Sequence, residues 1–326
     1  MSGRRRQLLA ISAVVLVLPA LAGCGSSSDD AEQTALAAVS TPQAGAPSLS
    51  SDSAKAPKRC PADPTASLRP PPRPDAMPAG SLMARIRRRG VLRAGVDQNT
   101  LLLAYRQPST TSIQGFEVDL VREIARAIFG DPNKVDLRAV TTDQRFDLVQ
   151  SGDVDLVVDA ATIRCKRLGQ VLFSTVYYDA GQRVLVPSDS SARGLADLGG
   201  RRVCVTKGST TLQLLERYRP KLVPYVVDQR TDCLVALQEG RVAAISSDDA
   251  ILLGFRAQDP STKIVGPRLA NEPYGIAISR SHPEFVRFVN GVLDRLRRDG
   301  TWKAIHHRWF SGLAPTPSPP RPHYRD

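Results

Sequence analysis

Residues 155–178 have the sequence DLVVDAATIRCKRLGQVLFSTVYY, the most specific pattern in this chain. A short apolar strand at residues 156–158 leads through small and hydroxylated residues to Thr162, and Arg167 follows. Ligands of open α/β sheets bind at the carboxyl ends of strands, and a guanidinium with hydroxyl and amide donors suits a carboxylate. The pattern therefore indicates an anion site, although an ordinary strand and loop with a surface arginine would have the same composition.

The same segment resembles, without a gap, the signature D-A-I-I-x-G-M-T-I-T-x-E-R-x-x-x-V-x-F-S-x-P-Y-Y of the extracytoplasmic solute-binding proteins of family 3. These are the receptors of polar amino-acid ABC importers, including glutamine- and glutamate-binding lipoproteins. Residues 289–310 resemble the family's ending, N-x-x-L-x-x-L-R-x-D-G-T-…-K-x-x-x-x-W-F. The resemblance covers about residues 85–312. It implies an α/β, type II periplasmic-binding-protein fold, in which two β/α lobes are joined by a two-strand hinge.

The order of the predicted elements agrees with this fold class. In the first half, strands are predicted at residues 92–96, 135–140 and 155–158, and a short helix at residues 144–150. Apolar residues between 118 and 128 are spaced for one face of a further helix, with Gly130 predicted as its C-cap. A second, smaller series has strands at residues 202–205 and 242–246, with a helix at residues 233–238. Alternating strands and helices at this spacing predict a parallel, doubly wound sheet.

Residues 1–24 have the pattern of a lipoprotein signal peptide. Arg4–Arg6 form a basic region, residues 8–18 are apolar, and Leu21-Ala22-Gly23-Cys24 matches the bacterial lipobox. The apolar run is too short for a spanning helix. We expect Cys24 to carry the lipid that holds the protein at the outer face of the cytoplasmic membrane; a plain secretory signal is the alternative.

The remaining chain divides by composition. Residues 25–80 are rich in Ser, Ala and Pro without an apolar period, which predicts a tether. Lobe 1 is predicted at residues 85–181 and 275–312, and lobe 2 at residues 182–274. The Pro-rich residues 313–326 are predicted to be a disordered tail.

Four cysteines remain when Cys24 is assigned to lipid: Cys60, Cys165, Cys204 and Cys233. An even number in an oxidising compartment predicts two disulfides, with three possible connectivities. Cys204–Cys233 is favoured because both cysteines fall in lobe 2, and Cys60–Cys165 then follows. The sequence contains no C-x-x-C and no His cluster, so neither a metal nor another cofactor is expected.

The chain has 326 residues, 42% of them hydrophobic, and a formal charge of +12. This length accommodates two lobes of roughly 100 residues each. Lys and Arg are scattered and do not form a basic stripe interleaved with aromatic residues. Nucleic acid is therefore not expected as a partner.

The family resemblance gives each lobe part of an amino-acid site. In lobe 1, Thr162 is expected to donate to the ligand and Arg167 to pair with its α-carboxylate, while the backbone carbonyl at Ala160 accepts from the α-ammonium. In lobe 2, the turn Gly208-Ser209-Thr210 matches the family's G-[ST]-T, whose donors bind the same carboxylate. Asp248 matches the acid that pairs with the α-ammonium.

Several of these residues have structural alternatives. Ser209 and Thr210 would also suit a helix N-cap, and Asp248 or Asp249 would suit the cap of the following helix. Phe116 and Tyr178 are expected in the core rather than against the ligand.

The side-chain end of the site departs from better-known members of the family. Members that bind amides or bases have aromatic residues at the positions of Thr100 or Leu103 and of Thr142. Asp97 lies at a position that contacts the ligand side chain in relatives, and Asp159 at one that is often Ser. Two carboxylates favour an amide or a cation as ligand, whereas an acidic ligand would need a compensating cation such as Arg145. Glutamine, asparagine, glutamate, aspartate and basic amino acids all remain candidates.

These inferences predict a monomeric, lipid-anchored receptor that passes a polar amino acid to the permease and ATPase subunits of an ABC importer. A sensor subunit that signals amino-acid supply to a membrane partner is an alternative. Cyclohexadienyl-type dehydratases share the fold and need a positioned acid or base, for which Asp159 is the candidate. We do not expect an enzyme.

Overall fold

The computed structural model describes residues 60–73 and 76–325. The predicted signal peptide, Cys24 and the first part of the predicted tether lie outside these residues. Over the described residues, no helix combines the length and the apolar character needed to cross a membrane.

The first lobe is built on a mixed sheet with the strand order β6-β2-β7-β14-β8. Its strands are β2 (Leu92–Val96), β6 (Val135–Ala139), β7 (Leu156–Val157), β8 (Val171–Phe173) and β14 (Ala277–Ser279). β6, β2 and β7 are parallel, as predicted, whereas β14 runs antiparallel to β7 and β8. β14 has the opposite direction because the chain enters it on its return from the second lobe.

Helices and a small antiparallel sheet surround the first sheet. The helices are α1 (Leu82–Arg89), α2 (Phe116–Phe129), α3 (Arg145–Ser151), α4 (Cys165–Leu168), α8 (Pro283–Arg298) and α9 (Thr301–Phe310). The small sheet consists of β3 (Asn99–Thr100), β4 (Ala104–Arg106) and β5 (Ile113–Gln114). Gly130 ends α2 with φ +76° and donates its N–H to the Arg126 carbonyl, as the predicted C-cap requires.

An aromatic cluster forms the centre of the first lobe. The ring of Phe116 is fully buried and lies 5.7–6.3 Å, between ring centroids, from five other rings: Tyr177, Tyr178, Trp302, His306 and Phe310. The expected core role of Phe116 and Tyr178 is confirmed. Because α9 supplies three of these rings, the last helices of the chain complete the lobe that begins near residue 82.

The second lobe repeats the arrangement with the strand order β11-β10-β12-β9-β13. Its strands are β9 (Tyr178–Pro187), β10 (Arg202–Thr206), β11 (Val223–Val227), β12 (Ala244–Asp248) and β13 (Thr262–Tyr274). The helices are the 3-10 turn η1 (Leu195–Leu198) and α5 (Thr210–Arg217), α6 (Arg230–Gln238) and α7 (Asp249–Gln258). β10, β11 and β12 are parallel, and β9 is antiparallel to β12 and β13.

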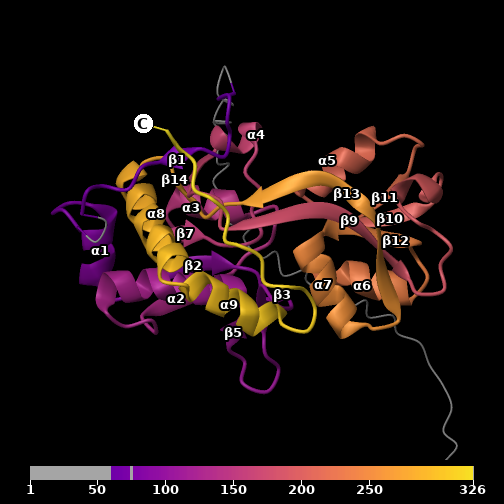
Figure 1. Cartoon of the computed structure of the whole chain (residues 1–326), viewed down its shortest axis with the longest axis horizontal. Helices are drawn as coiled ribbons and strands as arrows, with labels where there is room; N and C mark the ends of the chain where they lie inside the picture. Colours follow the sequence, from indigo (N-terminus) through magenta and orange to yellow (C-terminus); the bar gives the residue numbers. More distant parts are fainter. Residues whose placement is uncertain (1–59, 74–75, 326) are drawn as a thin grey trace, which may run out of the picture. The chain divides into compact units, whose positions relative to one another are not determined.

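β9 and β13 connect the two sheets. They pair in antiparallel fashion from Tyr178 opposite Tyr274 to Pro187 opposite Thr262. In Figure 1 they lie side by side and run from the elements of the first sheet to those of the second. The lobe boundaries predicted from the sequence fall on or next to these strands. We propose that the lobes divide here, at residues 181/182 and 274/275.

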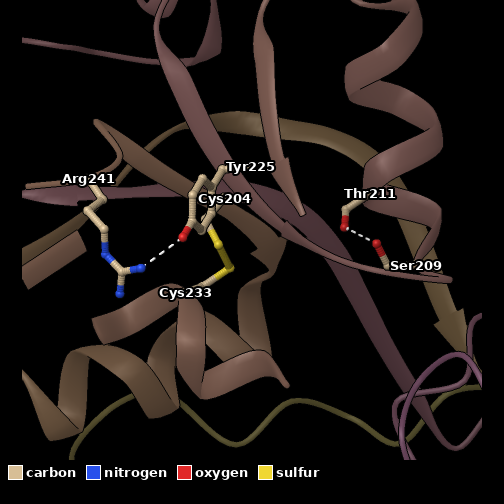
Figure 2. Close-up of a disulfide and its surroundings, with 6 residues drawn as sticks. All are labelled: Cys204, Ser209, Thr211, Tyr225, Cys233 and Arg241. Carbon is tan, nitrogen blue, oxygen red and sulfur yellow. Dashed lines mark hydrogen bonds between the residues drawn. A yellow bond between two sulfur atoms is a disulfide. The ribbon is translucent and has the colours of Figure 1, made fainter. Parts of the chain in front are cut away.

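The described residues form two disulfides, Cys60–Cys165 and Cys204–Cys233, in the connectivity favoured from the sequence. Figure 2 shows Cys204 on β10 bonded to Cys233 on α6. Beside them Arg241 donates to the Tyr225 hydroxyl oxygen. Cys204–Cys233 joins β10, which lies between β11 and β12 in the sheet of the second lobe, to α6.

The ends of the described chain pack on the body, which corrects two expectations. β1 (Ser67–Leu68) pairs in parallel with β15 (Tyr324–Arg325). The buried side chain of Asn290 donates to the Ser67 hydroxyl and the Leu68 carbonyl. The predicted tether therefore does not extend to residue 80, and residues 313–325 are not a disordered tail. Composition missed this order because the contacts join segments about 250 residues apart, as in the bond from Ser67 N–H to the His323 carbonyl.

Tyr324→Phe tests the clasp formed by β1 and β15. The Tyr324 hydroxyl donates to Asp294 Oδ2 at 2.5 Å, so its removal should lower the free energy of unfolding by about 1 kcal/mol. Urea denaturation followed by circular dichroism measures this difference. Tyr218→Phe is the matched control, because the Tyr218 hydroxyl makes no hydrogen bond among the described residues. Equal stabilities of the two variants would contradict a structural role for the clasp.

Candidate functional site

The loop after β7 holds the first part of the site. Ala160 has φ +43°, and its N–H donates to Glu117 Oε1 at 2.6 Å. The loop is fixed against the returning chain by bonds from Ile163 N–H to the Pro273 carbonyl and from Gly275 N–H to the Ala161 carbonyl. The predicted strand-to-loop transition thus places Ala160 and Thr162 in a rigid turn beside the hinge.

Arg167 lies on α4 and is 7% exposed. Its Nη1 donates to the Thr162 carbonyl at 2.8 Å, and its Nη2 donates to the Gly208 carbonyl of the second lobe at 3.1 Å. Burial, and then the charge of Arg145, lower the pKa of Arg167 to about 9. Its positive charge is incompletely compensated, as expected of a cation that awaits an anionic ligand.

The turn before α5 supplies the second lobe's donors. Gly208 has φ +71°, a conformation that favours glycine, and Ser209 is the N-cap of α5, with its Oγ accepting from Leu212 N–H. The Ser209 and Thr211 hydroxyls share a hydrogen bond of 2.8 Å (Figure 2). The Thr210 hydroxyl donates to Glu272. The N-cap alternative is therefore realised, and the donors left for an anion are the first-turn backbone N–H groups, which have no partner inside a helix.

Asp248 ends β12 and occupies the N-cap position of α7 without capping that helix. Its Oδ2 accepts from the Tyr274 hydroxyl at 2.7 Å, while its Oδ1 is buried and has no hydrogen-bond partner among the described residues. Burial, and then the charge of Glu272, raise the pKa of Asp248 to about 7. A buried acceptor without a partner is costly, so this oxygen indicates a missing donor.

Asp97 and Asp159 are both buried and already hold a cation of the protein itself. Arg230, the first residue of α6 in the second lobe, donates through Nη1 to Asp97 Oδ2 and, at 2.6 Å, to Asp159 Oδ1. Arg145 donates to Asp159 Oδ2 at 3.1 Å. The expectation that these two carboxylates favour donors on the ligand is therefore corrected, because two buried guanidiniums balance their charges.

A small cavity of about 20 Å³ lies between the lobes, with space for about one water molecule. Most of the predicted ligand-binding residues line it from both sides: Ala160, Thr162 and Arg167 from the first lobe, and Ser209, Thr210 and Asp248 from the second. Arg145 and Arg230 also line it, whereas Asp97 and Asp159 do not. An amino acid is larger than this space, so the described state is a closed one that must open to admit a ligand.

Sequence reasoning missed Arg230. A signal was available: Asp97 and Asp159 are two acids in otherwise apolar surroundings, and buried carboxylates require a cation or a proton. Arg230 opens a helix directly after a strand of the second lobe, at the sheet edge where sites form. The sequence did not show that this arginine reaches across to the other lobe.

The sequence matches a known family over most of its length. The model of the bacterial extracellular solute-binding proteins, family 3, matches residues 92–312. An ABC transporter glutamine-binding protein of Bacillus subtilis (strain 168) is 32% identical over 217 residues, which are 66% of this chain and 80% of that protein. A glutamate/aspartate import solute-binding protein of Salmonella typhimurium is 27% identical over 248 residues, 73% of this chain and 82% of that protein.

Solved structures of similar sequence have the same fold. A mutant of the arginine-binding protein ArgBP from T. maritima superposes with a TM-score of 0.66 at 30% identity, and the match covers 70% of this chain and 99% of that one. Residues 92–312, which match the family model, include both five-stranded sheets and every residue that lines the cavity between the lobes.

Proposed function

This chain belongs to family 3 of the bacterial extracellular solute-binding proteins, and from that premise we propose that it is a lipid-anchored receptor that captures a polar amino acid between its lobes and delivers it to an ABC importer. The family consists of extracytoplasmic receptors and not of enzymes. Its members named above bind glutamine, or import glutamate and aspartate. The anchor in this proposal is the lipid on Cys24.

The observation that carries the proposal is the position of Arg167 and Asp248. They come from different lobes and line the same cavity. The guanidinium would pair with the ligand α-carboxylate, and the unpartnered Oδ1 of Asp248 would accept from the α-ammonium. The backbone of the Ala160–Thr162 loop and the first turn of α5 would add donors and acceptors. One zwitterion would thus satisfy groups on both lobes, which makes closure dependent on the ligand.

The expected hydrogen bonds can account for micromolar binding. Hydrogen bonds to charged groups contribute about 1.5–3 kcal/mol each, so five or six of them sum to about 7.5–18 kcal/mol. Contacts in the upper part of this range offset the cost of ordering and closure and leave the roughly 8 kcal/mol of a micromolar complex.

A catalytic role finds no support at the candidate acid. Asp159 accepts hydrogen bonds from Arg230 and Arg145 through its two carboxylate oxygens and is fully buried. A carboxylate held by two guanidiniums is a poor acid or base. We therefore propose binding without chemistry.

A thermal-shift screen with the twenty amino acids tests the proposed function. The protein is the full chain purified in detergent, and polar amino acids should raise its unfolding temperature in proportion to the logarithm of their concentration. Isothermal titration calorimetry then measures the affinities. If none of the twenty amino acids shifts the unfolding temperature, the receptor proposal fails.

Affinity should depend on pH through Asp248. Its pKa is about 7 in the ligand-free protein, and a bound ammonium would favour the ionised form. Between pH 6 and pH 8 the affinity should therefore rise about tenfold, with a proton released on binding below pH 7. Calorimetry in two buffers of different ionisation enthalpy measures the released proton.

Tyr274→Phe is the matched control for this pH dependence. The Tyr274 hydroxyl lowers the pKa of Asp248 by donating to its carboxylate, so its loss should move the midpoint to higher pH. In the ligand-free protein, the ionisation of Asp248 lowers folding stability as pH rises, whereas it raises ligand affinity. Because the pKa of Asp248 in the folded state lies above its ordinary value of 3.8, stability is lost as pH rises from about 4 to about 7. A pH-independent affinity without proton release would rule out this role of Asp248.

A further inference from the structure

Arg230 belongs to the second lobe, yet three groups of the first lobe hold its guanidinium. Nη1 donates to Asp97 Oδ2, to Asp159 Oδ1 at 2.6 Å and to Thr100 Oγ1 at 3.2 Å. Arg230 and Asp97 are each 5% exposed, and Asp159 is fully buried. The same guanidinium lines the cavity between the lobes. Arg230 therefore lines the proposed ligand space and also connects the two lobes.

The two carboxylates that hold Arg230 are also held in position by other groups of the first lobe. Asp97 Oδ1 accepts from the N–H groups of Gln98 and Asn99 at 2.6 and 2.8 Å, and its Oδ2 accepts from the Thr100 hydroxyl. Asp159 is held from its other side by Arg145. Such a preorganised pair of acids would receive a cation from a ligand equally well. In this chain the protein supplies the cation.

The charges around the inner end of the cavity show how the ion pairs of Arg230 with Asp97 and Asp159 affect the binding of a ligand side chain. Around the inner end, Arg145 and Arg230 face Asp97 and Asp159, which gives a net charge of zero. Burial disfavours the charged form of Arg230, but Asp159 and then Asp97 outweigh burial and raise its pKa. A ligand ammonium or guanidinium at this end would meet two cations whose counter-charges are already used.

We propose that Arg230 determines the specificity of the site: its guanidinium takes the place of a ligand cation on Asp97 and Asp159, so the receptor rejects arginine and lysine and binds amino acids whose side chains are not cationic, such as glutamine. The inference rests on the proposed function, because it concerns the inner end of the same cavity. It removes the basic amino acids from the ligands that the proposed function leaves open.

Calorimetry with the full chain tests this assignment on the wild type and on Arg230→Met. The probes are L-glutamine, L-lysine, L-arginine and L-citrulline, the uncharged isostere of arginine. In the wild type, glutamine should bind at least about tenfold more tightly than lysine or arginine. In Arg230→Met the two carboxylates lose their cation, and the affinity for arginine relative to glutamine should rise by about tenfold or more.

The comparison of arginine with citrulline separates the effect of the ligand's charge from the effect of its side-chain size. If Arg230 excludes cations by charge, arginine gains more than citrulline in Arg230→Met; an equal gain of both ligands would overturn the charge argument. The double variant Arg230→Met with Asp159→Asn restores the charge balance and should lose most of the gain in arginine affinity.

The outcomes distinguish this inference from the proposed function. A wild type that binds arginine or lysine as tightly as glutamine overturns the role of Arg230 and leaves the receptor function standing. A wild type that binds none of the twenty amino acids refutes the receptor function itself. If Arg230→Met does not fold, as judged by circular dichroism, the wild-type ratio of arginine to glutamine affinity decides the question.

Discussion

Arg167→Ala is expected to lower the affinity for the preferred amino acid by at least about 30-fold. Removing one member of a buried, hydrogen-bonded charge pair costs about 2–5 kcal/mol, because the α-carboxylate would enter the closed cavity without its partner. The fold should survive this change. Burial lowers the pKa of Arg167 to about 9, so folding disfavours its charge, and this cost offsets part of what its hydrogen bonds to the Thr162 and Gly208 carbonyls contribute to stability.

Arg167→Lys is the matched control. An ammonium keeps the charge but cannot donate two parallel hydrogen bonds to a carboxylate, so this variant should bind with an affinity between those of the wild type and Arg167→Ala. Isothermal titration calorimetry gives the affinities, and thermal unfolding checks the fold. Wild-type affinity in Arg167→Ala would remove the carboxylate clamp from the proposed site.

The double variant Cys204→Ala, Cys233→Ala is expected to lose about 3–4 kcal/mol of unfolding free energy. The disulfide closes a loop with a sequence separation of 29 residues, and in the chain-entropy model its removal relaxes the unfolded state by that amount. Both cysteines are buried against the sheet of the second lobe, so the substitutions also leave a small packing defect. Urea denaturation monitored by circular dichroism measures the loss.

The reduced wild type and the reduced double variant are the controls for this pair. Both lack the disulfides described above, and only the reduced wild type keeps the two sulfur atoms of Cys204 and Cys233 in the core, so the difference between them isolates the packing defect from the cross-link. Ligand affinity should change little, because neither cysteine lines the cavity. A peptide map that pairs Cys204 with another cysteine would exclude this cross-link and its stabilisation.

Local pattern was sufficient for some elements of the first lobe. β2 has its predicted bounds and α2 ends at the predicted Gly130, because each depends on neighbours within one strand or one helical turn. The short strands β3, β4, β5 and β8 were not predicted from the sequence. The order of the elements, with α8 and α9 at the end of the chain completing the first lobe, follows from the resemblance of residues 289–310. The residues that determine these features lie within the elements themselves.

Local pattern was less reliable at the ends of the chain. Proline-rich composition normally predicts disorder, yet residues 313–325 are ordered because Tyr324 contacts Asp294 and β15 pairs with β1. Mean composition describes what a segment can do in isolation. It does not include partners supplied by distant parts of the chain.

The sequence by itself determined the family and the two-lobed fold and predicted Arg167 as the partner of a ligand carboxylate, because the strand, loop and arginine of residues 155–178 form one contiguous pattern. Only the tertiary structure showed that Arg230 contacts Asp97 and Asp159 of the other lobe beside these residues. Arg230 is 133 residues from Asp97 and 71 from Asp159 along the chain. Their meeting depends on how two lobes close over a shared cavity, and no local periodicity encodes a contact between side chains of different lobes.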